Sequence, residues 1–198
     1  MFSWENAFIP AVIALPFALY HTSKFRWYMP LPEGYERLSG WLFPLSAADL
    51  AFHEGGHPVF GMLSGGNEFI TAAGGTLMQL AIPAVCLYTF WKQGSRAGVV
   101  FSLFWIGFNL LNVAYYLADA QQQVIILITG MSGGEGGMHD WGTMLETLHL
   151  KKYCVGLGQL TFLAGTFLFC FGLAYPIAWA LRQAGLLALA PGETRLLG

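Results

Sequence analysis

The sequence has few charged residues. Asp, Glu, Lys and Arg together make up 10% of the 198 residues, whereas hydrophobic residues make up 56%. One soluble core of this size cannot hide so much apolar surface from water. The scarcity of charge therefore argues against a soluble globular protein and predicts an integral membrane protein surrounded by lipid.

A basic cluster is also missing, and cysteine is rare. The formal net charge is -2, and the few Lys and Arg residues form no patch, which argues against nucleic acid as a partner. Cys86, Cys154 and Cys170 match no C-x-x-C pattern. We expect them to pack in or beside membrane helices, so they do not report a redox compartment.

Long runs without charge are present instead. Phe69 to Trp91, Ala97 to Ala118 and Tyr153 to Leu181 each reach the roughly 20 residues that a helix needs to cross the hydrocarbon. Two further spans are expected, a short apolar one near the amino terminus, which lacks the basic start of a signal peptide, and one interrupted by polar residues. We predict an all-α, polytopic membrane protein with a single domain over residues 1–198. The five predicted spans cover residues 6–20, 42–64, 69–91, 97–119 and 155–181.

The positive charges predict an orientation. The loops after the first, third and fifth predicted spans hold seven cations, and the opposite side holds only Lys151 and Lys152. By the positive-inside rule, the seven-cation side faces the cytoplasm and the amino terminus faces out. The seven cations are Lys24, Arg26, Arg37, Lys92, Arg96, Arg182 and Arg195.

The second predicted span carries the sequence HEGGH, residues 53–57. It matches H-E-x-x-H, in which His53 and His57 lie about 40° apart around a helix and can hold one metal ion. In zinc hydrolases with this pattern, the ion polarises the scissile carbonyl and acidifies a bound water, whose proton the glutamate takes. The motif therefore predicts a Zn²⁺ site with Glu54 as the catalytic base.

The alternative is that both histidines are core residues bonded to nearby hydroxyl or carbonyl groups. An ionisable residue at the centre of a membrane helix costs on the order of 3 kcal/mol and usually marks function. Three such residues within about one turn favour metal binding. Gly55 and Gly56 fit either close helix packing or room for a substrate backbone.

Two histidines do not complete a zinc site, so a third ligand is needed. The candidates near the predicted non-cytoplasmic ends of the spans are Asp119, at the end of NLLNVAYYLADA, and His139, in MHDWG. Asp140 has three possible roles: it could orient an imidazole from outside the ligand set, cap the helix that begins near WGTMLETL, or bind the metal itself.

Three amides lie inside predicted spans. Gln79 is expected to find a hydrogen-bond partner, and beside a metal site it could hold a substrate backbone. Asn109 and Asn112 lie three residues apart on one face of the fourth span. They could position an extended substrate or lock helices together.

Residues 131–142, MSGGEGGMHDWG, are rich in glycine. They could form a flexible loop outside the membrane, or a re-entrant or covering segment that lines a cavity. Residues 131–137 are our candidate for a gate over the path of water to the site. Glu135 and Glu68 are expected in solvated loops, and Asp49 is expected to be a helix-start charge or to pair with another element.

These residues together resemble the integral membrane zinc metalloproteases of the site-two protease type. The resemblance rests on H-E-x-x-H in a membrane helix, a following span with glycines, and an asparagine and an aspartate farther along. It implies zinc held by two histidines and a later aspartate, in a water-accessible cavity where membrane-embedded peptides are cut. The family's aspartate usually lies in an N-x-x-P-x-x-x-L-D-G-like element. Here Tyr115 stands at the proline position and Ala120 replaces the glycine, whereas HDWG lies at a separation from HEGGH closer to that of the family.

We therefore expect a multi-pass intramembrane zinc endopeptidase with its active site toward the non-cytoplasmic side and a membrane protein or peptide as substrate. The alternative is a non-proteolytic metal-binding membrane protein, such as a transporter, a sensor or an inactive relative. A membrane oxygenase or haem protein would require either histidine boxes, for which the five histidines present are too few, or facing histidines on separate spans.

Overall fold

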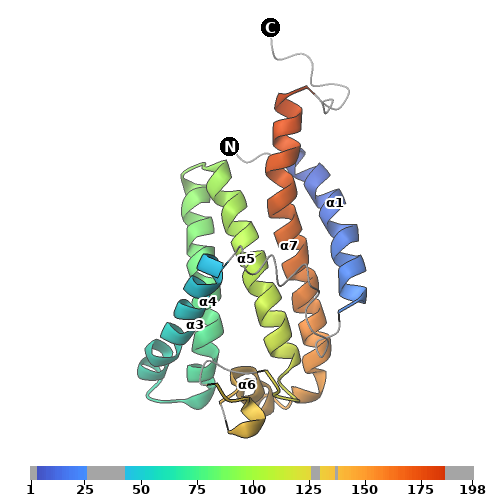
Figure 1. Ribbon diagram of the computed structural model, residues 1–198. Helices are drawn as coiled ribbons and strands as arrows, with labels where there is room; N and C mark the ends of the chain where they lie inside the picture. Colours follow the sequence, from blue (N-terminus) through green and yellow to red (C-terminus); the bar gives the residue numbers. More distant parts are fainter. Residues whose placement is uncertain (1–3, 26–42, 126–129, 137, 186–198) are drawn as a thin grey trace.

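The computed structural model describes residues 4–25, 43–125, 130–136 and 138–185, and Figure 1 shows that helices dominate them. Within these residues there is no β-strand, which confirms the predicted all-α class. The long helices are α1 (Trp4–Ser23), α3 (Phe43–Leu63), α4 (Glu68–Lys92), α5 (Arg96–Ala118) and α7 (Cys154–Gln183). The short helices are η1 (Gly133–Glu135), α6 (Asp140–Thr147) and η2 (Lys151–Tyr153).

The long helices follow one another across the molecule (Figure 1). Helix α3 packs on α4, α4 on α5, α5 on α7, and α7 on α1. Helix α6 lies at the end of the bundle where α3 and α5 finish, and it packs mainly on α4. Helices α3, α4, α5 and α6 therefore come together at one end of the bundle, and the polar side chains of the candidate site lie there.

Three helices are long and apolar enough to cross a membrane: Glu68–Lys92, Arg96–Ala118 and Lys151–Gln183. They coincide with the three charge-free runs of the sequence. Helix α1 contains only a shorter apolar stretch, Ala7–Ser23, and α3 carries the charged and polar residues of the HEGGH region. The structure is compatible with a membrane protein, but the predicted count of five spans is not confirmed.

Glycines allow α5 and α7 to approach closely. Gly158, Gly165 and Gly172 recur every seven residues along α7, so they lie on one face of that helix. A Cβ atom on Gly165 would lie 2.9 Å from the Leu111 nitrogen, and one on Gly172 would lie 2.6 Å from the Phe104 Cβ. This seam of small residues is the kind of packing that holds membrane helices together.

Tight turns connect the helices that form the site. Between α3 and α4, Gly65 and Gly66 have φ values of 67° and 87°, a left-handed conformation that glycine adopts without steric cost. Asn67 then accepts a hydrogen bond from the Ile70 nitrogen and caps α4, as asparagine commonly does at a helix start. The short turn makes α3 and α4 an antiparallel pair.

The described cations do not show the predicted charge difference between the two ends of the bundle. The ring of Phe25 lies 5.0 Å from that of Tyr115 and 4.9 Å from that of Phe162, so α1 finishes at the end where α5 finishes and α7 begins (Figure 1). Lys24 thus lies at the same end as Lys151 and Lys152, whereas the orientation predicted from the sequence separates them. Lys92, Arg96 and Arg182 lie at the other end, and Arg26, Arg37 and Arg195 are outside the described residues.

The glycine-rich segment covers one end of the bundle. Ser132 donates to Glu135 from both its backbone nitrogen and its hydroxyl, each over 3.0 Å, and closes the turn of η1. These bonds lower the pKa of the exposed Glu135 carboxyl. The described part of residues 131–137 leads directly to α6 (Figure 1), so a re-entrant segment is not confirmed.

Candidate metal centre

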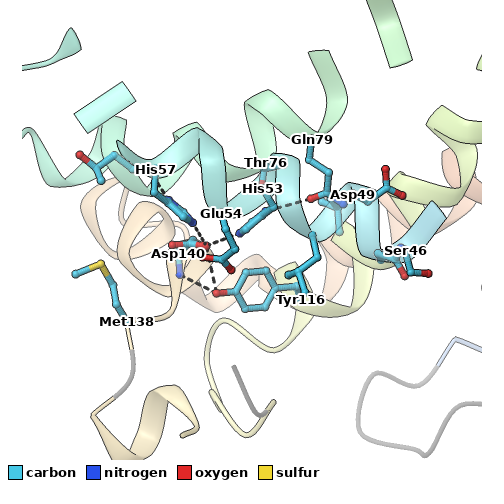
Figure 2. Close-up of a pocket in the computed structure, with 14 residues that line it drawn as sticks. Ser46, Asp49, His53, Glu54, His57, Thr76, Gln79, Tyr116, Met138 and Asp140 are labelled. Carbon is cyan, nitrogen blue, oxygen red and sulfur yellow. Dashed lines mark hydrogen bonds and ion pairs between the residues drawn. The ribbon is translucent and has the colours of Figure 1, made fainter. Parts of the chain in front are cut away.

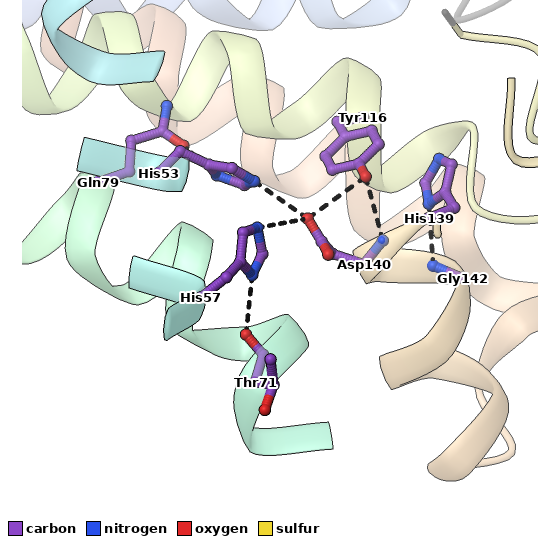
Figure 3. A network of polar contacts seen from close by, with 8 residues as sticks. All are labelled: His53, His57, Thr71, Gln79, Tyr116, His139, Asp140 and Gly142. Carbon is purple, nitrogen blue, oxygen red and sulfur yellow. Dashed lines mark hydrogen bonds and ion pairs between the residues drawn. The ribbon is translucent and has the colours of Figure 1, made fainter. Parts of the chain in front are cut away.

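Two histidines of α3 meet one aspartate of α6. His53 and His57 lie one turn apart, with ring centroids 4.9 Å from each other. Their Nε2 atoms lie 3.0 Å and 3.5 Å from the Asp140 Oδ2 atom, as Figure 3 shows. One ligand atom from each residue lies within 4.8 Å of the other two. The three side chains can therefore hold a metal ion between them.

Hydrogen bonds on the far side of the His53 ring determine which nitrogen carries its proton. The backbone carbonyl of Trp105 can only accept, so the Asn109 amide donates to it over 3.1 Å. The Asn109 oxygen then accepts from the Gln79 amide over 2.7 Å. The Gln79 oxygen is left facing His53 Nδ1 at 3.1 Å, so Nδ1 must be the donor.

The ring of His57 is oriented in the same way by a simpler contact. Its Nδ1 atom lies 2.9 Å from the backbone carbonyl oxygen of Thr71, at the start of α4. A carbonyl oxygen only accepts, so His57 Nδ1 also carries the proton. In the neutral form of both rings, Nε2 is therefore an unprotonated atom with a lone pair.

The consequence is a convergence of three acceptors on one point. Two Nε2 lone pairs and a carboxylate oxygen repel one another unless a proton or a cation lies between them. Histidines that bind metals through one nitrogen usually donate the other N–H to a carbonyl or carboxylate, which fixes the ring and raises its basicity. The contacts of His53 and His57 have this form, and the donor set fits a divalent metal ion.

Asp140 is held at the first residue of α6 by Tyr116. Its backbone nitrogen donates to the Tyr116 hydroxyl over 3.1 Å, and that hydroxyl lies 3.4 Å from Asp140 Oδ2. Tyr116 follows Asn109 and Asn112 at helical spacing on α5. This tyrosine is not among the site residues predicted from the sequence, although its i+4 spacing from Asn112 places it on the same helix face.

Glycines let the backbone of α4 lie against the histidine face of α3. A Cβ atom on Gly75 would lie 2.6 Å from His57 Cε1 and 2.8 Å from His53 Cε1. A Cβ atom on Gly56 would collide with the Gly74 carbonyl. The glycines in and opposite the motif are therefore required by the close approach of the two helices, and Gly75 leaves the space that the imidazole rings occupy.

A cavity of about 510 Å³ opens beside the three candidate ligands. Glu54 lines it, half-buried, and Figure 2 shows its side chain near Asp140 and Tyr116. Asn112 also lines the cavity. The other lining residues are Ser46, Asp49, Leu50, His53, His57, Thr71, Thr76, Gln79, Val113, Tyr116, Met138 and Asp140.

The two ligands preferred from the sequence lie in a separate pair. His139 Nε2 faces the Asp119 Oδ2 atom at 3.4 Å. The Asp119 carboxylate also accepts from the backbone nitrogens of Val124 and Ile125, over 3.1 Å and 2.9 Å. Backbone donors and His139 thus engage Asp119, and in the structure Asp140 takes the place beside the two histidines that we expected for Asp119 or His139.

His139 is unsuited to the metal for a second reason. Its Nδ1 atom accepts the Gly142 N–H over 3.0 Å and caps the start of α6. Because Nδ1 accepts, the proton of the neutral ring lies on Nε2, which is 3.4 Å from the Asp119 carboxylate but has no hydrogen-bond partner among the described residues. Burial lowers the pKa of His139 below its ordinary value of 6.5, which favours this neutral form.

The remaining candidates have structural or supporting positions. Gln79 and Asn109 belong to the hydrogen-bonded chain behind His53, which explains why amides occur inside apolar helices. Asp49 accepts a hydrogen bond from the Trp105 indole over 2.7 Å, the tertiary pairing expected for it. Thr71 contributes only its carbonyl oxygen to the site, so no side-chain pattern in the sequence could have indicated it.

Comparisons with protein-family models, curated protein sequences and solved structures gave no match.

Proposed function

We propose that the protein is a zinc-dependent endopeptidase that cuts membrane-embedded or membrane-proximal peptides. The observation that supports this most directly is the convergence of His53 Nε2, His57 Nε2 and Asp140 Oδ2, with both Nδ1 protons donated outward. The cavity beside them also contains Glu54, a carboxylate next to the first histidine in the chain. This is the donor set of a catalytic zinc site, three protein ligands and a neighbouring base.

Each residue of the centre has a role in this proposal. Zinc held by His53, His57 and Asp140 would polarise the scissile carbonyl and acidify a water molecule. Glu54 takes the proton of the attacking water and delivers it to the leaving nitrogen. Tyr116 holds Asp140 in place through its hydroxyl.

The shape around the centre favours an extended peptide as substrate. A second cavity, of about 450 Å³, lies farther toward the end of α3, and three residues, His57, Thr71 and Met138, line both cavities. A chain running from one cavity into the other would pass beside the candidate ligands. Two span-length helices, α4 and α5, contribute residues to the cavity, which favours a peptide that lies in or near the membrane.

The decisive experiment compares wild-type protein with Glu54→Gln. Full-length protein would be purified in lipid nanodiscs, loaded with zinc and incubated with a panel of transmembrane peptides, and products would be identified by mass spectrometry. The variant should bind as much zinc as the wild type, while cleavage falls by about 10²–10⁴-fold, the usual contribution of a general base.

Glu146→Gln is the matched control, because Glu146 lies on α6 and pairs with Lys151 over 3.1 Å, away from the cavity. It should cut at the wild-type rate. Zinc binding without any difference in cleavage between wild type and Glu54→Gln would contradict the peptidase proposal and favour a metal transporter, a sensor or an inactive relative.

A further inference from the structure

The cavity beside the metal centre contains two buried polar atoms that the proposed chemistry does not use. They are Asp49 Oδ2 and Thr76 Oγ1, and neither has a hydrogen-bond partner among the described residues. The two residues are 2% and 7% exposed, and both line the cavity. A buried polar atom without a partner costs free energy in the empty protein, so both atoms indicate a ligand that supplies donors.

Asp49 has an acceptor oxygen to spare. Its Oδ1 atom accepts from the Trp105 indole. The Asn109 amide, which donates to the backbone carbonyl of Trp105, also interacts with the Asp49 carboxylate, but Oδ2 has no hydrogen bond of good geometry among the described residues. Within the part of the chain that the structure describes, no Lys, Arg or His forms an ion pair with Asp49. The carboxylate is thus enclosed by protein without a compensating positive charge.

Asp49 lies on the same helix as the two candidate histidine ligands. It precedes His53 by four residues on α3, so it lies on the same face, about 6 Å of helix rise away. An extended peptide advances about 3.3 Å per residue. A substrate passing along α3 would therefore bring a side chain to Asp49 about two residues from the bond beside His53.

We infer that Asp49 and Thr76 form a subsite for a lysine or arginine side chain of the peptide substrate. This inference rests on the proposed peptidase function. A cationic side chain supplies several N–H donors and a positive charge, so it can pair with Asp49 Oδ2 and donate to Thr76 Oγ1 together. A backbone N–H supplies one donor and leaves the charge uncompensated.

The wall of the cavity also suits the stem of such a side chain. Leu50 and Val113 line the same cavity, and their apolar surfaces can cover the methylene groups of lysine or arginine. Long cationic side chains commonly bury the stem against apolar surface while the charged head finds polar partners.

The first experiment uses peptides that differ in charge but not in shape. Zinc-loaded full-length protein would be given two transmembrane peptides that carry arginine or its neutral isostere citrulline two residues from the cleaved bond, on either side. The wild type should cut the arginine peptide with a kcat/KM at least about tenfold higher, the effect of one charge-assisted hydrogen bond. In Asp49→Asn this ratio should fall to near one.

Two results would overturn the subsite. One is wild-type cleavage with no preference for arginine, which leaves the peptidase proposal intact. The other is a preference that persists in Asp49→Asn. Thr76→Val, which removes only the hydroxyl, should lower the ratio by a smaller factor, and its effect checks that the Asp49→Asn result does not come from general damage to the cavity.

A second experiment does not depend on cleavage. Trp105 donates to Asp49, so 5-fluorotryptophan at this position reports on the carboxylate by ¹⁹F NMR, with the signal assigned from Trp105→Phe. Butylguanidinium chloride should shift this signal in the wild type and not in Asp49→Asn. The signals of the other tryptophans show whether the variant is folded.

The two experiments separate the inference from the proposed function. A shift with butylguanidinium in a protein that cuts no peptide supports the cation subsite and contradicts the peptidase proposal. No shift overturns the subsite whatever the protein cuts. An equal shift with potassium chloride at the same concentration would show a general ion site and would also overturn it.

Discussion

Two histidine–aspartate clusters lie next to each other in this protein, and they differ in where the histidine proton points. In the first, His53 and His57 donate from Nδ1 to Gln79 and Thr71, so both Nε2 atoms face Asp140 as acceptors. In the second, His139 accepts at Nδ1, so the proton of its neutral ring lies on Nε2, 3.4 Å from Asp119 Oδ2. The first arrangement needs a proton or a cation between its three acceptors, whereas the second places a neutral ring beside a carboxylate.

The comparison shows that the partner of Nδ1 determines what the other ring nitrogen can do. Residues 139 and 140 are adjacent in the chain, yet they belong to different clusters because α6 begins between them. His139 is the cap of that helix and Asp140 is its first residue. At the start of α6, the His139 side chain therefore bonds to the backbone of its own helix, whereas the Asp140 side chain faces the histidines of α3.

The largest expected effect comes from exchanging one aspartate in each cluster for asparagine. Asp140→Asn should reduce bound zinc from stoichiometric to near zero, because it removes a charged ligand. Asp119→Asn, the matched control, should keep its zinc. Metal analysis of the purified variants by mass spectrometry measures both, and loss of zinc in Asp119→Asn with retention in Asp140→Asn would reverse our assignment.

A methyl group placed between the rings should have the next largest effect. Gly75→Ala puts a carbon 2.6 Å from His57 Cε1 and 2.7 Å from its Nε2, so the rings must move. Zinc affinity, measured by competition with a chelator, should fall by more than the roughly 10–100-fold typical of changes outside the ligand set.

Gly55→Ala is the control for that change. Gly55 belongs to the HEGGH motif that Gly75 faces, but a Cβ atom there would have no neighbour within 4 Å among the described residues. Zinc affinity should stay at the wild-type value, and α3 should gain up to about 1 kcal/mol from the better helix propensity of alanine. An equal loss of zinc affinity in Gly75→Ala and Gly55→Ala would mean that both glycines act through helix flexibility.

Removing the partner of His53 should have a moderate effect. Gln79→Leu deletes the oxygen that accepts the Nδ1 proton, so the ring loses its fixed orientation, and zinc affinity should fall by about 10–100-fold. Gln93→Leu, at the carboxyl end of α4, should leave affinity unchanged. An unaltered affinity in Gln79→Leu would show that packing alone orients the ring.

The smallest expected effect lies in the second cluster. His139→Ala removes the cap of α6 and should lower the stability of the zinc-free protein by about 1 kcal/mol, seen as a lower apparent melting temperature. His139→Asn, which can still cap the helix, should recover most of the loss. Zinc stoichiometry should be normal in both variants, and its loss would show that His139 is a ligand after all.

Much of the fold could be predicted from local sequence patterns. A charge-free run of about 20 residues has few stable conformations other than a helix in lipid, and Phe69–Trp91, Ala97–Ala118 and Tyr153–Leu181 coincide with the three span-length helices. The direction of α1 could not be predicted, because it depends on packing of Phe25 against Tyr115 and Phe162. Because α1 runs in this direction, Lys24 lies at the same end of the bundle as Lys151 and Lys152, and not at the end predicted for it.

The candidate site could be predicted only in part. His53 and His57 lie four residues apart, so helical geometry alone brings their rings together. Asp140 is 87 residues from His53. From the sequence, Asp119, His139 and Asp140 were all plausible as the third ligand. The choice among them depended on which backbone N–H groups engaged Asp119 and His139, and no spacing rule encodes such contacts.

The sequence by itself therefore determined the helical class, the span-length helices and the pairing of two histidines, because each follows from interactions between residues close in the chain. The tertiary structure alone decided the third member of the candidate metal centre, the protonated nitrogen of each neutral histidine and the position of Asp49 beside the cavity. These depend on contacts between helices α3, α4, α5 and α6. There, one hydrogen bond between residues distant in the chain decides whether a polar atom is already bonded within the protein or can bind a ligand.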